Sequence, residues 1–157
     1  MGSSSKILLF LFSPAGRVRR LWFAVTFMLG VAFIFVVQTV VAGISNVDAM
    51  LEIVRNALPL AAGYVLGVAS ARRLHDAGWS GWLVAPAAIP LLYTIAGSLF
   101  GQPVQDLNHI VPVFVIGNWI SGLWLLLCIA LCFVPGNKGA NRYGPDPRRP
   151  ESAADQF

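Results

Sequence analysis

Four long apolar segments, separated by short polar ones, constrain this sequence more than any other feature. A membrane-spanning helix needs roughly 20 apolar residues to cross about 30 Å of hydrocarbon. The apolar residues do not alternate with a period of two, as they would in the strands of a membrane barrel. The chain therefore predicts an all-α fold, an integral membrane four-helix bundle. Its transmembrane helices are expected at residues 21–44, 53–71, 81–100 and 110–134.

Composition also indicates that lipid is the solvent of this chain. Hydrophobic residues make up 57% and charged residues 11% of the 157 residues, whereas about 25% of a soluble domain is charged. The net charge of +4 is compatible with nucleic-acid binding. The basic residues, however, stand at the ends of the apolar segments and not along one soluble face. Membrane orientation explains them better, and no nucleic-acid partner is expected.

The second apolar segment is interrupted at its start. Arg55 and Asn56 are polar, and Pro59 lacks a backbone donor. We expect these residues near the outer interface, where the Arg55 side chain can extend to water. Ser45 and Asp48 have the spacing of a capping box, which predicts that this helix begins before the membrane does.

Polar residues and prolines mark the third and fourth segments. Ser80 is a plausible N-cap for the third helix, and Pro90 should kink it. Pro135 follows the fourth helix and ends it. Cys128 and Cys132 lie within the fourth segment, so we interpret them as small buried residues and not as a disulfide or a metal site.

Lysine and arginine are distributed very unevenly around the four segments. Four stand in the N-terminal segment, two in the central loop and four in the C-terminal tail, which makes ten of the 11 Lys and Arg residues. Only Arg55 falls on the other side. Because cytoplasmic loops are rich in these residues, both termini are expected in the cytoplasm. The predicted organisation is a cytoplasmic, interfacial segment 1–19, a membrane domain 20–134, an ordered cytoplasmic loop 135–149 and a disordered tail 150–157.

Tryptophans and small residues give further expectations about packing. Trp22, Trp79 and Trp82 fall at the cytoplasmic boundary, as interfacial tryptophans do. Trp119 and Trp124 lie well inside the fourth segment and are expected to pack in the bundle. Small residues recur every four positions, which fits either packing within one bundle or a dimerisation face. They are Gly63, Gly67 and Ala71 in the second segment, Gly97 and Gly101 at the end of the third, and Gly117 and Ser121 in the fourth.

Three polar motifs are predicted to converge on the cytoplasmic side. They are GRVRR at 16–20, RRLHDAGWSGW at 72–82 and NRYGPDP at 141–147. In this order and spacing they resemble the domain-of-unknown-function 805 family of small bacterial inner-membrane proteins. The resemblance covers about residues 10–147, and the central motif is its most specific part. It implies a four-helix membrane domain in the bacterial inner (plasma) membrane, and it implies no activity.

The polar residues of these motifs are the candidate binding site. An ion pair of Asp76 with Arg72 is one option, and a pairing across the face with Arg17, Arg20 or Arg142 is another, which would latch the three segments together. Tyr143 is expected to pack near Trp79 or Trp82. The candidate residues for binding anionic headgroups or a partner are Arg17, Arg20, Arg72, Arg73, His75, Asp76, Asn141, Arg142 and Tyr143.

Catalysis is not expected at this cluster. His75 and Asp76 are adjacent on a helix and so do not face each other, and no Ser or Cys nucleophile has a recognisable spacing nearby. The other histidine, His109, is predicted on the opposite side of the membrane, which argues against a metal site. We therefore expect no enzyme activity, no metal and no cofactor.

Three functions remain open from the sequence. The first is a non-enzymatic membrane protein whose arginine cluster binds anionic lipid headgroups or a membrane-protein partner, as a monomer or a homo-oligomer. The alternative is a small-solute transporter or an oligomeric channel subunit. No ionisable residue lies deeper in the spans than Arg55, which counts against ion-coupled transport. A membrane enzyme acting on lipid or peptidoglycan precursors is the third.

Overall fold

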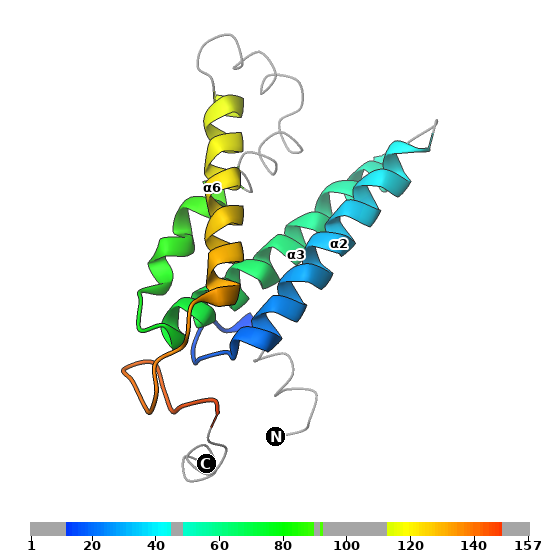
Figure 1. Ribbon diagram of the computed structural model, residues 1–157. Helices are drawn as coiled ribbons and strands as arrows, with labels where there is room; N and C mark the ends of the chain where they lie inside the picture. Colours follow the sequence, from blue (N-terminus) through cyan, green and yellow to red (C-terminus); the bar gives the residue numbers. More distant parts are fainter. Residues whose placement is uncertain (1–11, 45–48, 90–91, 93–112, 149–157) are drawn as a thin grey trace.

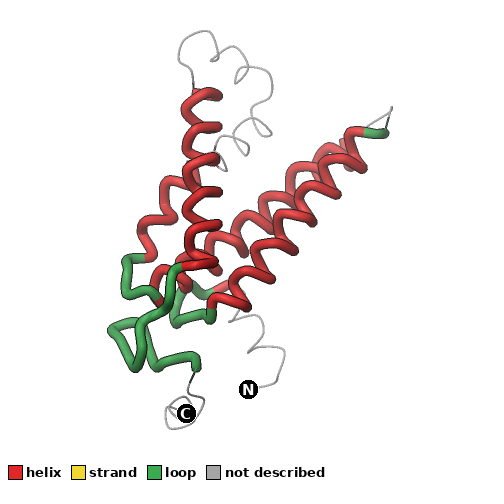
Figure 2. The backbone as a smooth tube through the Cα atoms, in the orientation of Figure 1, coloured by secondary structure: helices red, strands yellow, loops and turns green. Residues whose placement is uncertain are grey.

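The computed structural model describes residues 12–44, 49–89, 92 and 113–148. Within these ranges the fold is all-α and has no β-strand. Its elements in chain order are α2 (Arg20–Ala42), α3 (Ala49–Asp76), the 3-10 helix η1 (Gly81–Ala87) and α6 (Val113–Phe133) (Figure 1). The loops 12–19, 77–80 and 134–148 gather at one end of the helices (Figure 2), which we call the loop end.

The described helices form two arms. α2 and α3 pack side by side along their length, and η1 contacts both α3 and α6. The arms meet at the loop end and diverge away from it (Figure 1), so they are more open than a bundle packed along its whole length. The buried core lies where the arms meet, and its members come from the segment just before α2, the first turns of α2, the last turns of α3 and the last turns of α6. They are Val18, Phe23, Phe27, Leu66, Leu74, Cys128 and Leu131.

Small residues allow close helix contacts within one chain. A Cβ at Gly30 of α2 would lie 2.6 Å from Cδ2 of Leu66 on α3. A Cβ at Gly81 of η1 would lie 3.2 Å from Cβ of Ala71 on α3. For Ala71, packing within one chain is therefore the correct interpretation. A Cβ at Gly117 of α6 would meet nothing within 4 Å.

The observed boundaries agree with the first expected segment and extend the second. α3 begins at Ala49, before position 53, and continues as a helix to Asp76. The expected third helix starts as η1, and Ser80 caps it by accepting a hydrogen bond from the Trp82 N–H at 3.4 Å. Expectations for Ser45, Asp48, Pro90, His109 and most of the third segment lie outside the described residues. So do those for residues 1–11, the start of the fourth segment at 110–112, and 149–157.

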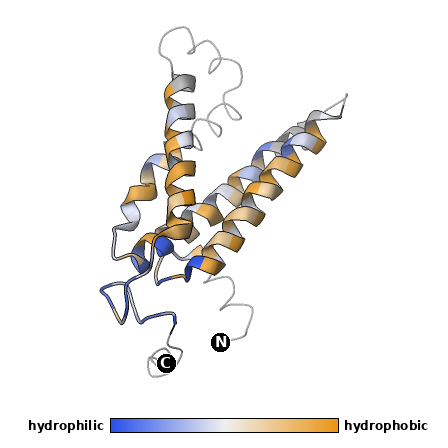
Figure 3. Cartoon of the chain, viewed as in Figure 1, coloured by the Kyte–Doolittle hydropathy of each residue, from blue (hydrophilic) through white to orange (hydrophobic). Residues whose placement is uncertain are grey.

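In the described part of the chain, one helix is long and apolar enough to cross a membrane, from Arg20 to Val41. Apolar residues cover the outer faces of α2 and α6, whereas the loop end is hydrophilic (Figure 3). Trp119 is 71% exposed on α6, so the expectation that it packs in the bundle is wrong. Trp124, by contrast, packs against the core. Cys128 is buried, and both cysteines are free, as expected.

Candidate functional site

The end of α3 positions the central motif. Gly78 has φ +80°, and this left-handed residue ends the helix. The Trp79 N–H donates to the Leu74 carbonyl at 2.8 Å, and the Gly78 N–H donates to the His75 carbonyl at 3.0 Å. These two bonds form a Schellman motif, which satisfies carbonyls at the helix end. The last turn of α3 is thereby fixed, and it presents Arg73, His75 and Asp76 at the loop end.

Asp76 is the centre of a buried ion triad with Arg17 and Arg73. Its Oδ1 accepts hydrogen bonds from Nε of Arg17 at 3.0 Å and from Nη2 of Arg17 at 2.8 Å. Its Oδ2 accepts a hydrogen bond from Nη1 of Arg73. The Asp76 residue is 3% exposed and Arg73 is 0% exposed. The pairing of Asp76 across the face with Arg17 is therefore present. A second arginine, Arg73, pairs with Asp76 from the same helix.

The other donors of the two triad arginines bind backbone carbonyls of distant segments. Nε of Arg73 donates to the Leu131 carbonyl at 3.0 Å, and its Nη2 donates to that of Val134. A cation at the C-terminal end of α6 also interacts favourably with the helix dipole. Arg17 donates through Nη1 to the Gly139 carbonyl at 2.6 Å and through Nη2 to that of Asn137. The triad thus joins the N-terminal segment, α3, α6 and the tail.

Two positive charges and one negative charge share this buried site. Burial lowers the pKa of Arg73, and Asp76 opposes that effect through its charge and its hydrogen bond. Burial also lowers the pKa of Arg72, which is 6% exposed. Removing one partner of a buried ion pair leaves an uncompensated charge and costs about 3–5 kcal/mol. We conclude that Arg17, Arg73 and Asp76 hold the loop end together.

The tail segment 134–148 crosses directly beneath the end of α3. The Asn137 N–H donates to the Asp76 carbonyl at 2.7 Å. A Cβ at Gly136 would lie 1.9 Å from Oδ2 of Asp76, a distance that no side chain can occupy. Glycine at position 136 is therefore required by the close approach of the tail to the triad.

His75 lies in a second, aromatic part of the site. Its ring stacks on that of Tyr143 with centroids 3.8 Å apart and an interplanar angle of 7°. The Arg142 Cζ lies 4.7 Å from the centroid of the Tyr143 ring. The Gly16 carbonyl oxygen lies 3.3 Å from Nδ1 of His75, and Nδ2 of Asn141 donates to the His75 carbonyl at 2.9 Å. The stacking partner of Tyr143 is thus His75, and not the expected Trp79 or Trp82.

The protonation of His75 is affected by this environment. Burial lowers the pKa of His75, and the positive charge of Arg142 lowers it further. The Gly16 carbonyl acts in the opposite direction because it accepts a hydrogen bond from the charged imidazole. The neutral ring is therefore favoured relative to a solvent-exposed histidine.

Asp146 and Arg148 organise the tail from within, and sequence reasoning did not include them in the site. Oδ2 of Asp146 accepts the Gly139 N–H at 3.0 Å, and Oδ1 accepts the Arg148 N–H at 3.0 Å. These backbone donors hold the pKa of Asp146 well below its usual range. Arg148 also donates to the carbonyls of Gly136 and Asn137. Proline on both sides of Asp146 was the available signal, because it is typical of an Asp-containing turn.

The structure brings the predicted site residues to the loop end but separates them by exposure. Arg17, Arg72, Arg73 and Asp76 have buried side chains. His75, Asn141 and Tyr143 are partly buried around the aromatic stack. Arg20 and Arg142 are exposed. The other exposed cations of the described loop end are Arg19, Lys138 and Arg148.

Comparison with known proteins adds a family and no activity. The sequence model of the family described as "Protein of unknown function (DUF805)" matches residues 11–145. No curated protein and no solved structure matches the chain. Among the described residues, no group of three or more His, Cys, Asp or Glu side chains could hold a metal ion.

Proposed function

Because the chain belongs to the DUF805 family, whose description names no activity, we propose its function from geometry. It is a non-enzymatic, multi-pass protein of the bacterial inner membrane, with four spans and both termini in the cytoplasm. The buried triad folds the tail over the helix ends. The exposed cations around it bind anionic lipid headgroups.

The apolar surface of the helices supports the membrane location. At 1.5 Å per residue, the 22 residues from Arg20 to Val41 are about 33 Å long, enough to cross the hydrocarbon. Large apolar side chains such as Leu21, Phe35 and Leu126 are each more than half exposed. A soluble monomer rarely exposes such continuous apolar area. A lipid environment around α2 and α6 would account for this exposed apolar surface.

The exposed charge at the loop end carries the headgroup proposal. Five cations are exposed there, and of these Arg148 forms an ion pair with Asp146 at 3.1 Å. Asp76 and Asp146, the described carboxylates of this end, are both buried. A basic residue near an anionic leaflet gains about 1 kcal/mol. Arginine also binds phosphate with two parallel donors. The stacking of Arg142 on Tyr143 holds one such guanidinium in place.

Lipid retention tests this proposal. The protein is purified in mild detergent with mixed phosphatidylglycerol and phosphatidylcholine, and the retained lipid is counted by native mass spectrometry. We expect the double variant Arg20→Gln, Arg142→Gln to lose most of the preference for phosphatidylglycerol. Its stability should fall by no more than about 1 kcal/mol, the value of the exposed contact between Arg142 and the Tyr143 ring.

The matched control is Arg55→Gln, which removes the same charge on the side predicted to face away from the cytoplasm. It should keep the preference. Equal retention of both lipids by the unmodified protein, or an unchanged preference in the double variant, would contradict headgroup binding.

A further inference from the structure

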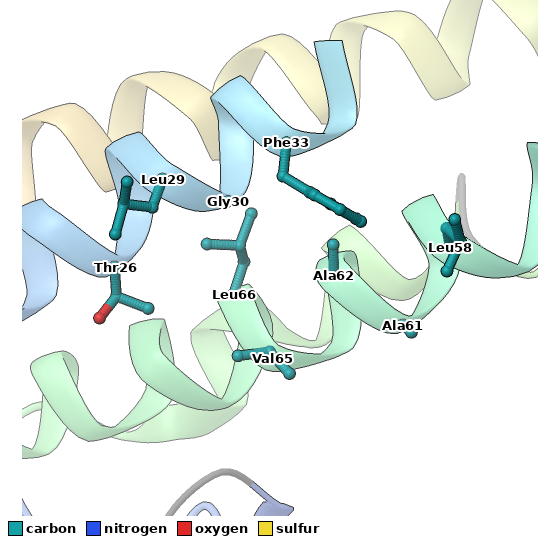
Figure 4. Close-up of a pocket in the computed structure, with 9 residues that line it drawn as sticks. All are labelled: Thr26, Leu29, Gly30, Phe33, Leu58, Ala61, Ala62, Val65 and Leu66. Atoms are coloured by element: carbon teal, nitrogen blue, oxygen red, sulfur yellow. The ribbon is translucent and has the colours of Figure 1, made fainter. Parts of the chain in front are cut away.

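An apolar groove runs between α2 and α3, outside the polar site. Its volume is about 440 Å³. Figure 4 shows the lining residues, one set on α2 and the other on the facing helix α3. They are Thr26, Leu29, Gly30, Phe33, Leu58, Ala61, Ala62, Val65 and Leu66.

The chemistry of the lining selects a hydrocarbon ligand. Thr26 is the only polar residue of the lining, and its hydroxyl already donates to the Trp22 carbonyl at 2.8 Å. A polar ligand would find only the acceptor lone pairs of this one hydroxyl along the groove, and it would lose its water. An apolar ligand has no hydrogen bonds to water that it would have to give up.

The size of the groove suits a slender occupant. A helix with its side chains is about 10–12 Å in diameter, so it would rest on the open side of the groove and would not fill its volume of about 440 Å³. The lining from Thr26 to Phe33 extends along α2 for about 10 Å at 1.5 Å per residue. A single extended hydrocarbon chain lying parallel to the helices fits these dimensions.

A positive charge stands at the loop end of the same helix face. Arg19 precedes Thr26 by seven residues, or two helical turns, and therefore lies on the same side of α2 about 10 Å away. Arg19 is exposed, and its Nε donates to the Pro147 carbonyl at 2.6 Å, which directs the guanidinium. Trp22, 64% exposed, lies between them at the level expected for the lipid interface.

We propose that the groove binds one acyl chain of an anionic phospholipid, with the lipid phosphate at Arg19. This inference rests on the membrane location and headgroup binding proposed above, and it adds a defined site for one lipid. Along α2, a cation, an interfacial aromatic ring and then the apolar groove follow one another. This order matches the phosphate, the interfacial region and the acyl chain of a phospholipid.

Photo-cross-linking tests the site. The full-length protein is reconstituted in vesicles with a phosphatidylglycerol that carries a diazirine in its acyl chain, and the labelled residues are mapped by mass spectrometry. We expect labelling of Leu29 and Val65 in the groove well above that of Leu123 and Leu126, which are exposed on α6. Equal labelling of both surfaces would overturn the proposal.

Two variants sharpen the test. Ala62→Phe fills the groove and should reduce groove labelling to the level of α6. Its matched control Ala130→Phe, at an exposed position of α6, should not. Arg19→Gln should lower the preference for phosphatidylglycerol over phosphatidylcholine about fivefold, the ratio that corresponds to about 1 kcal/mol per basic residue.

The outcomes separate this inference from the proposed function. If Ala62→Phe leaves groove labelling unchanged while Arg20→Gln, Arg142→Gln abolishes headgroup preference, the groove site is wrong and the proposed function stands. If the groove is labelled selectively but without preference for an anionic headgroup, the acyl-chain site stands and the proposed selection of an anionic lipid by Arg19 is wrong.

Discussion

The Nη2 atom of Arg17 lies 2.8 Å from Oδ1 of Asp76, although 59 positions separate the two residues in the chain. Both side chains are buried, with 1% and 4% of their surface exposed. Arg73 binds the other carboxylate oxygen. The Asp76 carboxylate therefore links the N-terminal segment to α3. Through the other hydrogen bonds of Arg17 and Arg73, it also links both of them to α6 and the tail.

Asp76→Asn should be the most destabilising single change at the loop end. It leaves two buried guanidinium groups with no counter-charge, so the free energy of unfolding should fall by about 3–5 kcal/mol. Unfolding in mixed detergent micelles, followed by circular dichroism, measures it. Asp155→Asn makes the same chemical change in the tail predicted to be disordered and should have no effect. A loss equal to that of the control would show that the triad does not stabilise the fold.

Gly136→Ala should destabilise the protein although it adds one methyl group. The new Cβ would lie 1.9 Å from Oδ2 of Asp76, so the tail or the carboxylate must move. Overpacking of this kind costs about 1–3 kcal/mol. Gly122→Ala is the matched control, because its Cβ would meet nothing within 4 Å. Within helix α6 that change should stabilise by about 0.5–1 kcal/mol, so the two melting temperatures should shift in opposite directions.

His75 should make stability depend on pH. Its pKa in the folded protein is lowered from the ordinary 6.5, so the unfolded chain binds more protons near that pH. Stability is then complete above pH 6.5 and falls as the pH decreases through the lower, folded-state pKa. Melting temperatures from pH 7.5 to pH 5 should show a drop in the unmodified protein that His75→Gln reduces. The groups that set this pKa are the buried surroundings, the Gly16 carbonyl and Arg142. An identical pH profile in His75→Gln would assign the drop to other groups.

The stack of Tyr143 on His75 should contribute through its rings and not through the phenol hydroxyl. Such pairs are worth about 0.5–1.5 kcal/mol beyond their buried area. Tyr143→Phe keeps the ring and should retain the stability, whereas Tyr143→Ala should lose at least this amount and free the Arg142 side chain. Thermal unfolding of the two variants measures this difference. Equal stability of Tyr143→Phe and Tyr143→Ala would show that the stack does not stabilise the fold.

The helices could be predicted from sequence to the extent that hydropathy determines them. α2 ends within two residues of the expected segment because no charge interrupts it. α3 exceeds its expected end at position 71 because Arg72, Arg73 and Asp76 continue the helix, and Asp76 compensates the charge of Arg73. A hydropathy pattern predicts the end of a span at the first arginine. Helix α3 instead continues to Asp76, and Gly78 then turns the chain. The 3-10 conformation of η1 has no comparable sequence signal.

The sequence predicts which residues form the candidate site better than it predicts what their side chains bind. Three separated polar motifs indicate one cluster, and opposite charges indicate a pairing of Asp76 with one of four arginines. These are Arg72, Arg17, Arg20 and Arg142. The carbonyl acceptors at Leu131, Asn137 and Gly139 could not be predicted. Every residue has a backbone carbonyl, so acceptors leave no mark in the sequence. For this reason Arg17 and Arg73 were expected to bind an external anion, and their buried donors instead hold the chain's own backbone.

Membrane topology is the remaining prediction, and it decides where the proposed lipid sites act. Ten of the 11 Lys and Arg residues flank one side of the predicted spans, which predicts that both termini lie in the cytoplasm. A reporter enzyme active only outside the cytoplasm should be silent when fused after Phe157 and active when inserted near Asp106. The inserted fusion serves as the control for expression. A strong signal after Phe157 would place Arg19, Arg20 and Arg142 at the outer leaflet. The headgroup proposal would then need anionic lipid on that side of the membrane.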